Sequence, residues 1–144
     1  MRFQRLAAFL LVLAACGTES EPTPARNVAG TWLVTFSNMT IGGTEACTLE
    51  PITLTLIQTG TFLSGTHTEA DLDCAIAGLV VQTAGVVSSG NVGPSSVTFR
   101  LDELAKTRTF NGTGSSETTM SGTVNWVTED GIQIVFGDWS AIEI

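Results

Sequence analysis

Hydrophobic and polar residues alternate along most of this chain, with the period of two that a β-strand with one buried face produces. In the first such segment, Trp32, Val34 and Phe36 fall on one face. Val, Ile, Thr and Phe dominate these segments and favour strands. The predicted strands are Val28 to Ser37, Ile52 to Leu56, Phe62 to Thr68, Leu79 to Gln82, Gly85 to Ser88, Val97 to Leu101, Thr107 to Thr113, Thr119 to Thr128 and Ile132 to Phe136.

Turn residues separate the predicted strands. Thr59-Gly60-Thr61 and Glu129-Asp130-Gly131 are typical of hairpin turns. Ser88 to Ser96 is rich in Gly, Ser and Pro, which predicts a loop. Asp71 to Ala77 is the one segment where a short helix would fit.

Short connections leave no room for crossover helices, so the pattern predicts an all-β fold. We expect a single antiparallel meander of about eight strands that closes as a small barrel. A β-sandwich remains the alternative, because it has the same period of two. Met120, Gly122, Val124 and Trp126 share a face, so Trp126 is expected to point inward.

The start of the chain has the layout of an export signal. Arg2 and Arg5 precede an uncharged apolar run from Leu6 to Ala15. This run is too short for a membrane-spanning helix, which needs about 20 residues. A basic start and a short apolar core that ends in small residues predict a secretory signal peptide over residues 1–15.

Leu13-Ala14-Ala15-Cys16 resembles the lipobox of bacterial lipoproteins. The resemblance implies cleavage before Cys16, acylation of Cys16 with chains such as palmitate, and attachment to a membrane through this lipid. Residues 16–26 then form a lipidated tether, polar and with two prolines. Gly17 follows the cysteine, which by the same resemblance favours the outer membrane, facing the periplasm or the cell surface. We expect a cell-envelope protein.

The charge of the chain excludes one class of partner. Its net charge is −8, and the two leader arginines leave four basic residues against fourteen acidic ones, or about −10, in the rest. Such a surface repels nucleic acid. Residues 27–144 are long enough for one folded domain with a single core.

Cys47 and Cys74 are the cysteines that remain after Cys16. An even pair in an exported domain predicts a disulfide bond. A bond that closes a loop of about 27 residues contributes roughly 3 kcal/mol of stability.

The sequence offers few candidate residues for catalysis or metal binding. His67 is the one histidine, and no Gly-X-Ser-X-Gly or phosphate-binding loop occurs. Glu69, Asp71 and Asp73 have a spacing that could hold calcium, although most such runs are solvated loops. We therefore expect no enzyme activity, no cofactor and no metal.

Gly30-Thr31-Trp32 resembles the opening of lipocalin-like and avidin-like barrels. The resemblance covers most of residues 27–144 and implies a Trp that plugs one end of the barrel. Together with Cys47-Thr48-Leu49 and Cys74, the motif is also similar to bacterial periplasmic metalloprotease inhibitors. That resemblance implies a protease-binding segment at Gly17 to Arg26.

Two functions follow as hypotheses. The first is a lipid-anchored envelope protein that carries a small apolar ligand in a cavity lined by residues such as Trp32, Phe36, Phe99 and Trp126. A fully packed interior would contradict it. The alternative is a module with a packed core that interacts with an envelope protein or inhibits a protease.

Overall fold

The computed structural model describes residues 26–103, 106–128, 131–132 and 134–144. Every regular element in these residues is a β-strand, which confirms the predicted all-β class. The described strands are β1 (Gly30–Ile41), β2 (Glu45–Leu49), β3 (Ile52–Thr59), β4 (Phe62–His67), β5 (Ala70–Cys74), β6 (Gly78–Gln82), β7 (Gly85–Val92), β8 (Ser96–Asp102), β9 (Thr107–Ser116), β10 (Thr119–Val127) and β11 (Ile134–Glu143).

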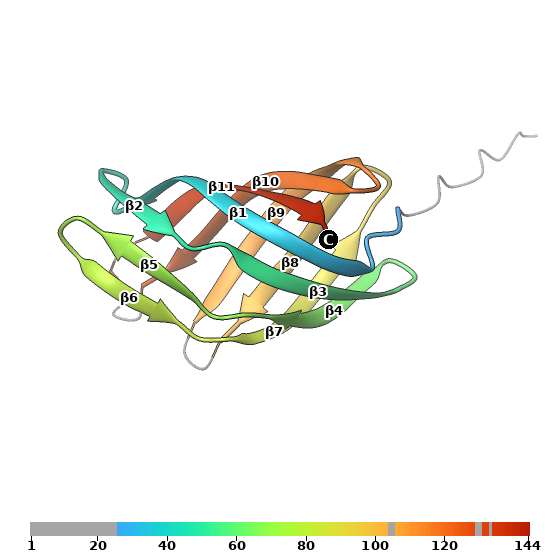
Figure 1. Cartoon of the computed structure of the whole chain (residues 1–144), viewed down its shortest axis with the longest axis horizontal. Coiled ribbons are helices and arrows are strands. Elements are labelled where there is room, and N and C mark those ends of the chain that lie inside the picture. Colours follow the sequence, from blue (N-terminus) through green and yellow to red (C-terminus); the bar gives the residue numbers. More distant parts are fainter. Residues whose placement is uncertain (1–25, 104–105, 129–130, 133) are drawn as a thin grey trace, which may run out of the picture.

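Eight of these strands close into an antiparallel barrel (Figure 1). The order around the wall is β1, β3, β4, β7, β8, β9, β10 and β11. β11 pairs with β1 and closes the ring, with Trp32 opposite Glu143 and Ile41 opposite Val135. The barrel prediction is therefore confirmed, and the sandwich alternative is excluded.

The remaining strands, β2, β5 and β6, continue the wall beyond one end of the barrel (Figure 1). β2 leads into β3, β5 follows β4, and β6 leads into β7, so each is the outer part of a bent wall strand. β2 pairs with β5, and β5 pairs with β6. We call this three-stranded sheet the extension, and the end of the barrel that carries it the extension end.

The core fills the lumen, because alternate residues of each wall strand point inward. Gly112 and Gly122 are paired across β9 and β10. A Cβ at Gly112 would lie 2.4 Å from Cζ2 of Trp139, so glycine makes room for this ring. The large buried side chains include Trp32, Val34, Ile52, Leu54, Leu56, Leu63, Val97, Phe99, Leu101, Phe110, Met120, Val124, Trp126, Val135 and Trp139.

The short helix considered at Asp71 to Ala77 is wrong. Most of this segment belongs to β5, which ends at Cys74 and is followed by a turn. Leu72 and Cys74 are buried, whereas Asp73 between them is exposed, so the period is that of a strand.

Several strand boundaries also differ from prediction; β1, for example, runs to Ile41 rather than Ser37. β7 runs on to Val92 through the segment predicted as a loop from Ser88, with an irregular register between Ser88 and Asn91. β11 runs to Glu143 rather than Phe136, because its inward positions continue to pair with β1.

The two predicted hairpins differ in how much of them the structure describes. Gly60 joins β3 to β4 with a φ of 63°, a left-handed conformation that suits glycine, so this turn is confirmed. Glu129 and Asp130 lie outside the described residues. The predicted signal peptide (1–15), the predicted lipidation site Cys16 and the predicted tether up to residue 25 also lie outside them.

Candidate functional site

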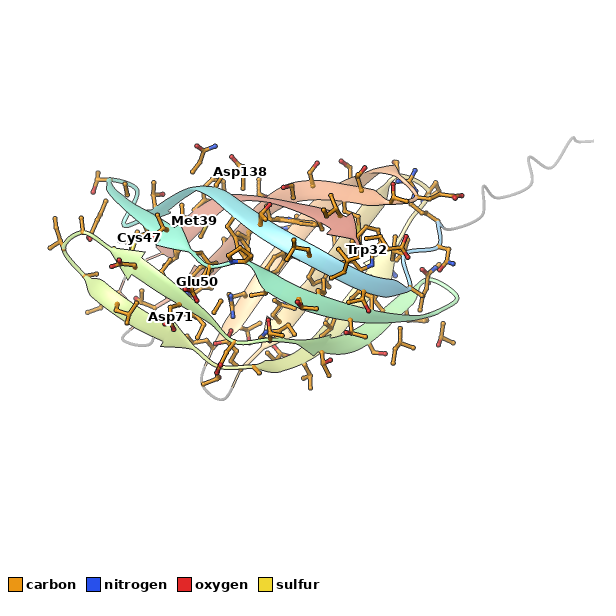
Figure 2. All side chains as sticks on the ribbon, viewed as in Figure 1. Trp32, Met39, Cys47, Glu50, Asp71 and Asp138 are labelled. Carbon is orange, nitrogen blue, oxygen red and sulfur yellow. A yellow bond between two sulfur atoms is a disulfide. The ribbon has the colours of Figure 1, made fainter. Side chains whose placement is uncertain are left out.

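Trp32 closes one end of the lumen, opposite the end where Cys47 lies (Figure 2). Its side chain is 1% exposed, and its Nε1 donates to the carbonyl of Val28 at 3.0 Å. Gln58 holds the incoming chain here, since its Oε1 accepts from Val28 N and its Nε2 donates to Arg26 O. We call this the closed end. The indole of Trp32 and the side-chain amide of Gln58 are both hydrogen-bonded there.

Four aromatic rings pack together in the middle of the lumen. Phe99 stacks on Phe110 with centroids 4.7 Å apart, and Trp139 meets both rings edge-on at 5.8 and 5.6 Å. Phe36 reaches Phe110 at 6.2 Å. The Trp139 Nε1 donates to Thr123 O, so this cluster also has its polar atom satisfied. We call these four residues the aromatic cluster.

The extension end of the lumen contains a buried charge. Arg108, at the start of β9, has no exposed surface and forms an ion pair with Glu103, which is also buried. The guanidinium carbon lies 5.6 Å from the centroid of the Trp126 ring, a cation–π contact. Burial lowers the pKa of Arg108 to about 10, so the group stays charged at neutral pH.

His67 ends β4 at the same end of the barrel and is 4% exposed. Its Nδ1 lies 3.0 Å from the carbonyl of Thr68. A carbonyl can only accept, so Nδ1 carries the hydrogen and Nε2 of the neutral ring is an acceptor. Burial, the largest influence, lowers the pKa of His67, and the charge of Arg108 lowers it further, against the opposing influences of the Thr68 carbonyl and of Asp102.

Several buried polar atoms at this end have no hydrogen-bond partner among the described residues. They are Nε2 of His67, Nε and Nη1 of Arg108, and Oε1 of Gln82, which ends β6. All three side chains are buried. Leaving such an atom unpaired costs roughly 1–3 kcal/mol. The atoms are inaccessible to solvent, so a ligand reaches them only when neighbouring side chains move.

The four residues predicted to line a cavity all have buried or partly buried side chains but lie in three places. Trp32 is at the closed end, Phe36 and Phe99 are in the aromatic cluster, and Trp126 touches Arg108 at the extension end. Arg108 was not predicted as a site residue. The alternation of β9 could have indicated it, because Arg108 lies two residues before Phe110 and therefore on the same, inward face.

The predicted disulfide is present and joins β2 to β5 within the extension. Cys47 and Cys74 are directly paired, with Cα atoms 4.2 Å apart. A surface depression beside the bond is lined by short side chains and one carboxylate, that of Asp73. It has no aromatic wall and no buried polar group, so it lacks the features of a specific ligand site.

Asp71 and Asp73 lie on the opposite face of β5 from the buried Leu72. Among the described residues, no group of three or more His, Cys, Asp or Glu side chains is placed to hold a metal ion.

Comparison with known proteins bears on the fold. No protein-family model and no curated protein matches this chain. Among solved structures, the fold is similar to that of EF1p2_mFAP2b bound to DFHBI, with a TM-score of 0.54. The likeness covers 81% of this chain and 94% of that chain at 15% sequence identity. At this identity the comparison supports the barrel fold alone.

Proposed function

We propose that this protein is a lipid-anchored binding protein of the bacterial cell envelope, and that its barrel holds a small, largely apolar ligand at the extension end. The observation that carries the proposal is the set of buried polar atoms at the extension end that have no partner among the described residues, those of Arg108 lying beside the Trp126 ring. Ligand sites commonly combine apolar walls with a few converging polar groups. A ligand that satisfied these atoms would remove their energetic cost.

The aromatic cluster supports an apolar ligand. Phe110 lies two residues after Arg108 on the inward face of β9, so rings lie next to the polar end of the lumen. Trp126 supplies a further apolar surface there. The body of the ligand would contact rings, while its polar group would meet Arg108 and His67.

The predicted anchor at Cys16 is compatible with this use of the barrel. Gln58 donates to the carbonyl of Arg26 at the closed end, so the described part of the chain begins at that end. The proposal accordingly puts a membrane anchored through Cys16 on the closed side. The extension end would then face the surrounding compartment, from which a ligand can arrive.

The proposal assigns a binding role and no catalytic one. A histidine that acts as a general base needs a nucleophile within hydrogen-bond reach. Nε2 of His67 has no hydrogen-bond partner among the described residues, and Nδ1 is engaged by a backbone carbonyl.

Native mass spectrometry tests the ligand proposal. Residues 26–144 contain every described strand and the whole described core, so this stretch holds what the barrel needs to close. It is incubated with a lipid and metabolite extract of the host, and the expected result is a retained adduct of defined mass. A bare protein mass under all extraction conditions would contradict the proposal.

The lipid anchor has its own test. The full chain is expressed in a bacterium that is fed an alkyne analogue of palmitate, and labelling is read on a gel. The chain with Cys16 should be labelled, and Cys16→Ser should not be. Equal labelling of the two chains, or labelling of neither, would remove the lipid anchor from the proposal.

A second candidate function rests on the packed rings of the aromatic cluster. Because Phe99, Phe110 and Trp139 fill the middle of the lumen with one another, the barrel could serve as a solid scaffold. It would then act as an interaction or protease-inhibitor module. Cross-linking in intact cells would enrich one envelope protein, and the mass spectrum would show no ligand.

A further inference from the structure

The unpartnered atoms at the extension end define a hydrogen-bonding pattern. Arg108 offers donors at Nε and Nη1. His67 offers an acceptor at Nε2, because Thr68 fixes the hydrogen on Nδ1. Gln82 offers a second acceptor at Oε1. A molecule that satisfies this pattern must both accept and donate hydrogen bonds.

We infer that the barrel selects ligands whose polar group is uncharged and both donates and accepts hydrogen bonds, as a primary amide or a urea does, and that Arg108 and His67 bind this group. The inference rests on the proposed binding function and names the chemical class of its ligand.

The charges around the site disfavour an anionic ligand. Glu103 already pairs with Nη2 of Arg108, and the charge of Asp102 also reaches His67. A carboxylate would therefore meet an arginine that is already neutralised. It would also place lone pairs against the acceptors of His67 and Gln82, which repel them.

A cationic ligand is disfavoured because it has donors but no acceptor for the Arg108 hydrogens. An ammonium group therefore leaves Nε and Nη1 of Arg108 unsatisfied. It also places a positive charge beside a guanidinium in surroundings where charges are poorly screened. An amide avoids both problems, because its oxygen accepts from Arg108 and its NH2 group donates to His67.

The strand positions bring the two main residues to one end of the lumen. His67 pairs with Gly85 at the start of β7, and Arg108 pairs with Leu101 near the end of β8. A Cβ at residue 85 would lie 2.8 Å from Nε2 of His67 and 2.1 Å from the carbonyl oxygen of Asp102, so only a glycine lets the start of β7 pack this closely beside the acceptor atom. Both residues therefore lie toward the extension end of the wall, His67 on β4 and Arg108 on β9, with β7 and β8 between them.

Three probes that share an eight-carbon chain test the inference: octanamide, octanoate and octylammonium at pH 7.5. Each is titrated into 15N-labelled residues 26–144, and binding is followed by NMR of the Arg and Trp side-chain NH signals. We expect octanamide to bind about tenfold tighter or more than either charged probe, because a buried donor or acceptor left unpaired penalises the wrong ligand.

Variants identify the residues that discriminate. Arg108→Met should abolish the preference for octanamide, whereas Arg100→Met, at an exposed arginine on β8, should leave it unchanged. Because Arg108→Met leaves Glu103 unpaired and can impair folding, His67→Phe gives a second test. It removes the acceptor at Nε2 and keeps a ring of similar size, and it should weaken octanamide binding selectively.

The outcomes separate the inference from the proposed function. Octanoate or octylammonium binding as tightly as octanamide, at the Arg108 signal, would overturn the inference and leave the binding function in place. Octanamide binding that is unchanged in His67→Phe and in folded Arg108→Met would also overturn it. If no probe binds and host extracts give no adduct, the proposed function itself fails. A retained host ligand that carries a carboxylate or an amine would contradict the inference alone.

Discussion

The two ends of the lumen differ in whether their buried polar groups are hydrogen-bonded. At the closed end, the Trp32 indole and both polar atoms of the Gln58 amide have partners within hydrogen-bond distance. At the extension end, Arg108 and His67 each keep buried atoms without partners. A fold stabilises itself by pairing its buried polar groups. The closed end thus has its polar groups paired, while the extension end keeps buried polar atoms unpaired among the described residues, at the place where the proposed ligand would bind.

Removing the Trp32 side chain at the closed end should give the largest loss of stability. Trp32→Ala deletes a fully buried indole and is expected to lower the free energy of unfolding by about 3–5 kcal/mol. Phe62→Ala, at a wall residue that is 69% exposed, is the control and should change it by less than about 0.5 kcal/mol. Urea denaturation measures both. A loss below 1 kcal/mol for Trp32→Ala would show that the closed end is not a stability element.

The disulfide should stabilise the extension end in particular. Replacing Cys47 and Cys74 together with Ala is expected to cost roughly 3 kcal/mol. Hydrogen exchange should accelerate in β2 and β5, which the bond joins, and stay slow between β1 and β11. Equal acceleration in both regions would mean that the barrel and the extension unfold as one unit.

Replacing both members of the buried ion pair with apolar residues should remove the unpaired polar atoms of Arg108 and leave the fold at least as stable as the wild type. Arg108→Met alone strands Glu103 and should be strongly destabilising. Arg108→Met combined with Glu103→Met replaces both charges by apolar groups, and it should match or exceed the wild-type stability by about 1–2 kcal/mol. Thermal unfolding compares the single and double variants. A double variant as unstable as the single one would show that the pair stabilises the fold.

The smallest expected effect is a dependence on pH that comes from His67. Burial lowers its pKa in the folded state, so the unfolded chain takes up a proton first as the pH falls below about 6.5. The contribution of the neutral, buried His67 to the free energy of unfolding should therefore be fully present above pH 7. It should then fall toward pH 5.5, by at most about 1.4 kcal/mol per pH unit.

His67→Phe should flatten this dependence, and no second histidine in the chain complicates the measurement. Chemical denaturation at pH 7.5, 6.5 and 5.5 provides the comparison. A variant with the same slope as the wild type would assign the dependence to carboxylates instead.

Much of the barrel could be predicted from the sequence, because alternation assigns each side chain to a face. It placed Trp32, Phe99 and Trp126 on inward faces, where they are buried. Cysteine count predicted the disulfide. The choice of a barrel over a sandwich needed strand order, which is decided by the pairing of β11 with β1 and leaves no local mark in the sequence.

The polar end could not be predicted in the same way. Alternation places Arg108 on the same face as Phe110, but a charged or amide side chain in a strand is normally expected to reach solvent, whereas Arg108 and Gln82 are completely buried. Of the extension, β6 matches the predicted strand from Leu79 to Gln82, whereas β2 and β5 were not predicted. The two aspartates of β5 hid its alternation, because they favoured a loop or a short helix. Glu103, which pairs with Arg108, belongs to no predicted strand.

The outermost strand of the extension has a practical consequence for handling the protein. Among the described strands, β6 pairs with β5 alone, so its other edge has no strand partner. Its sequence, Gly-Leu-Val-Val-Gln, contains no charge and no proline, the residues that commonly block association between exposed edges. Leu79 there is 62% exposed. Concentrated samples should therefore begin to aggregate at this strand, and Leu79→Lys is the substitution that would keep them in solution.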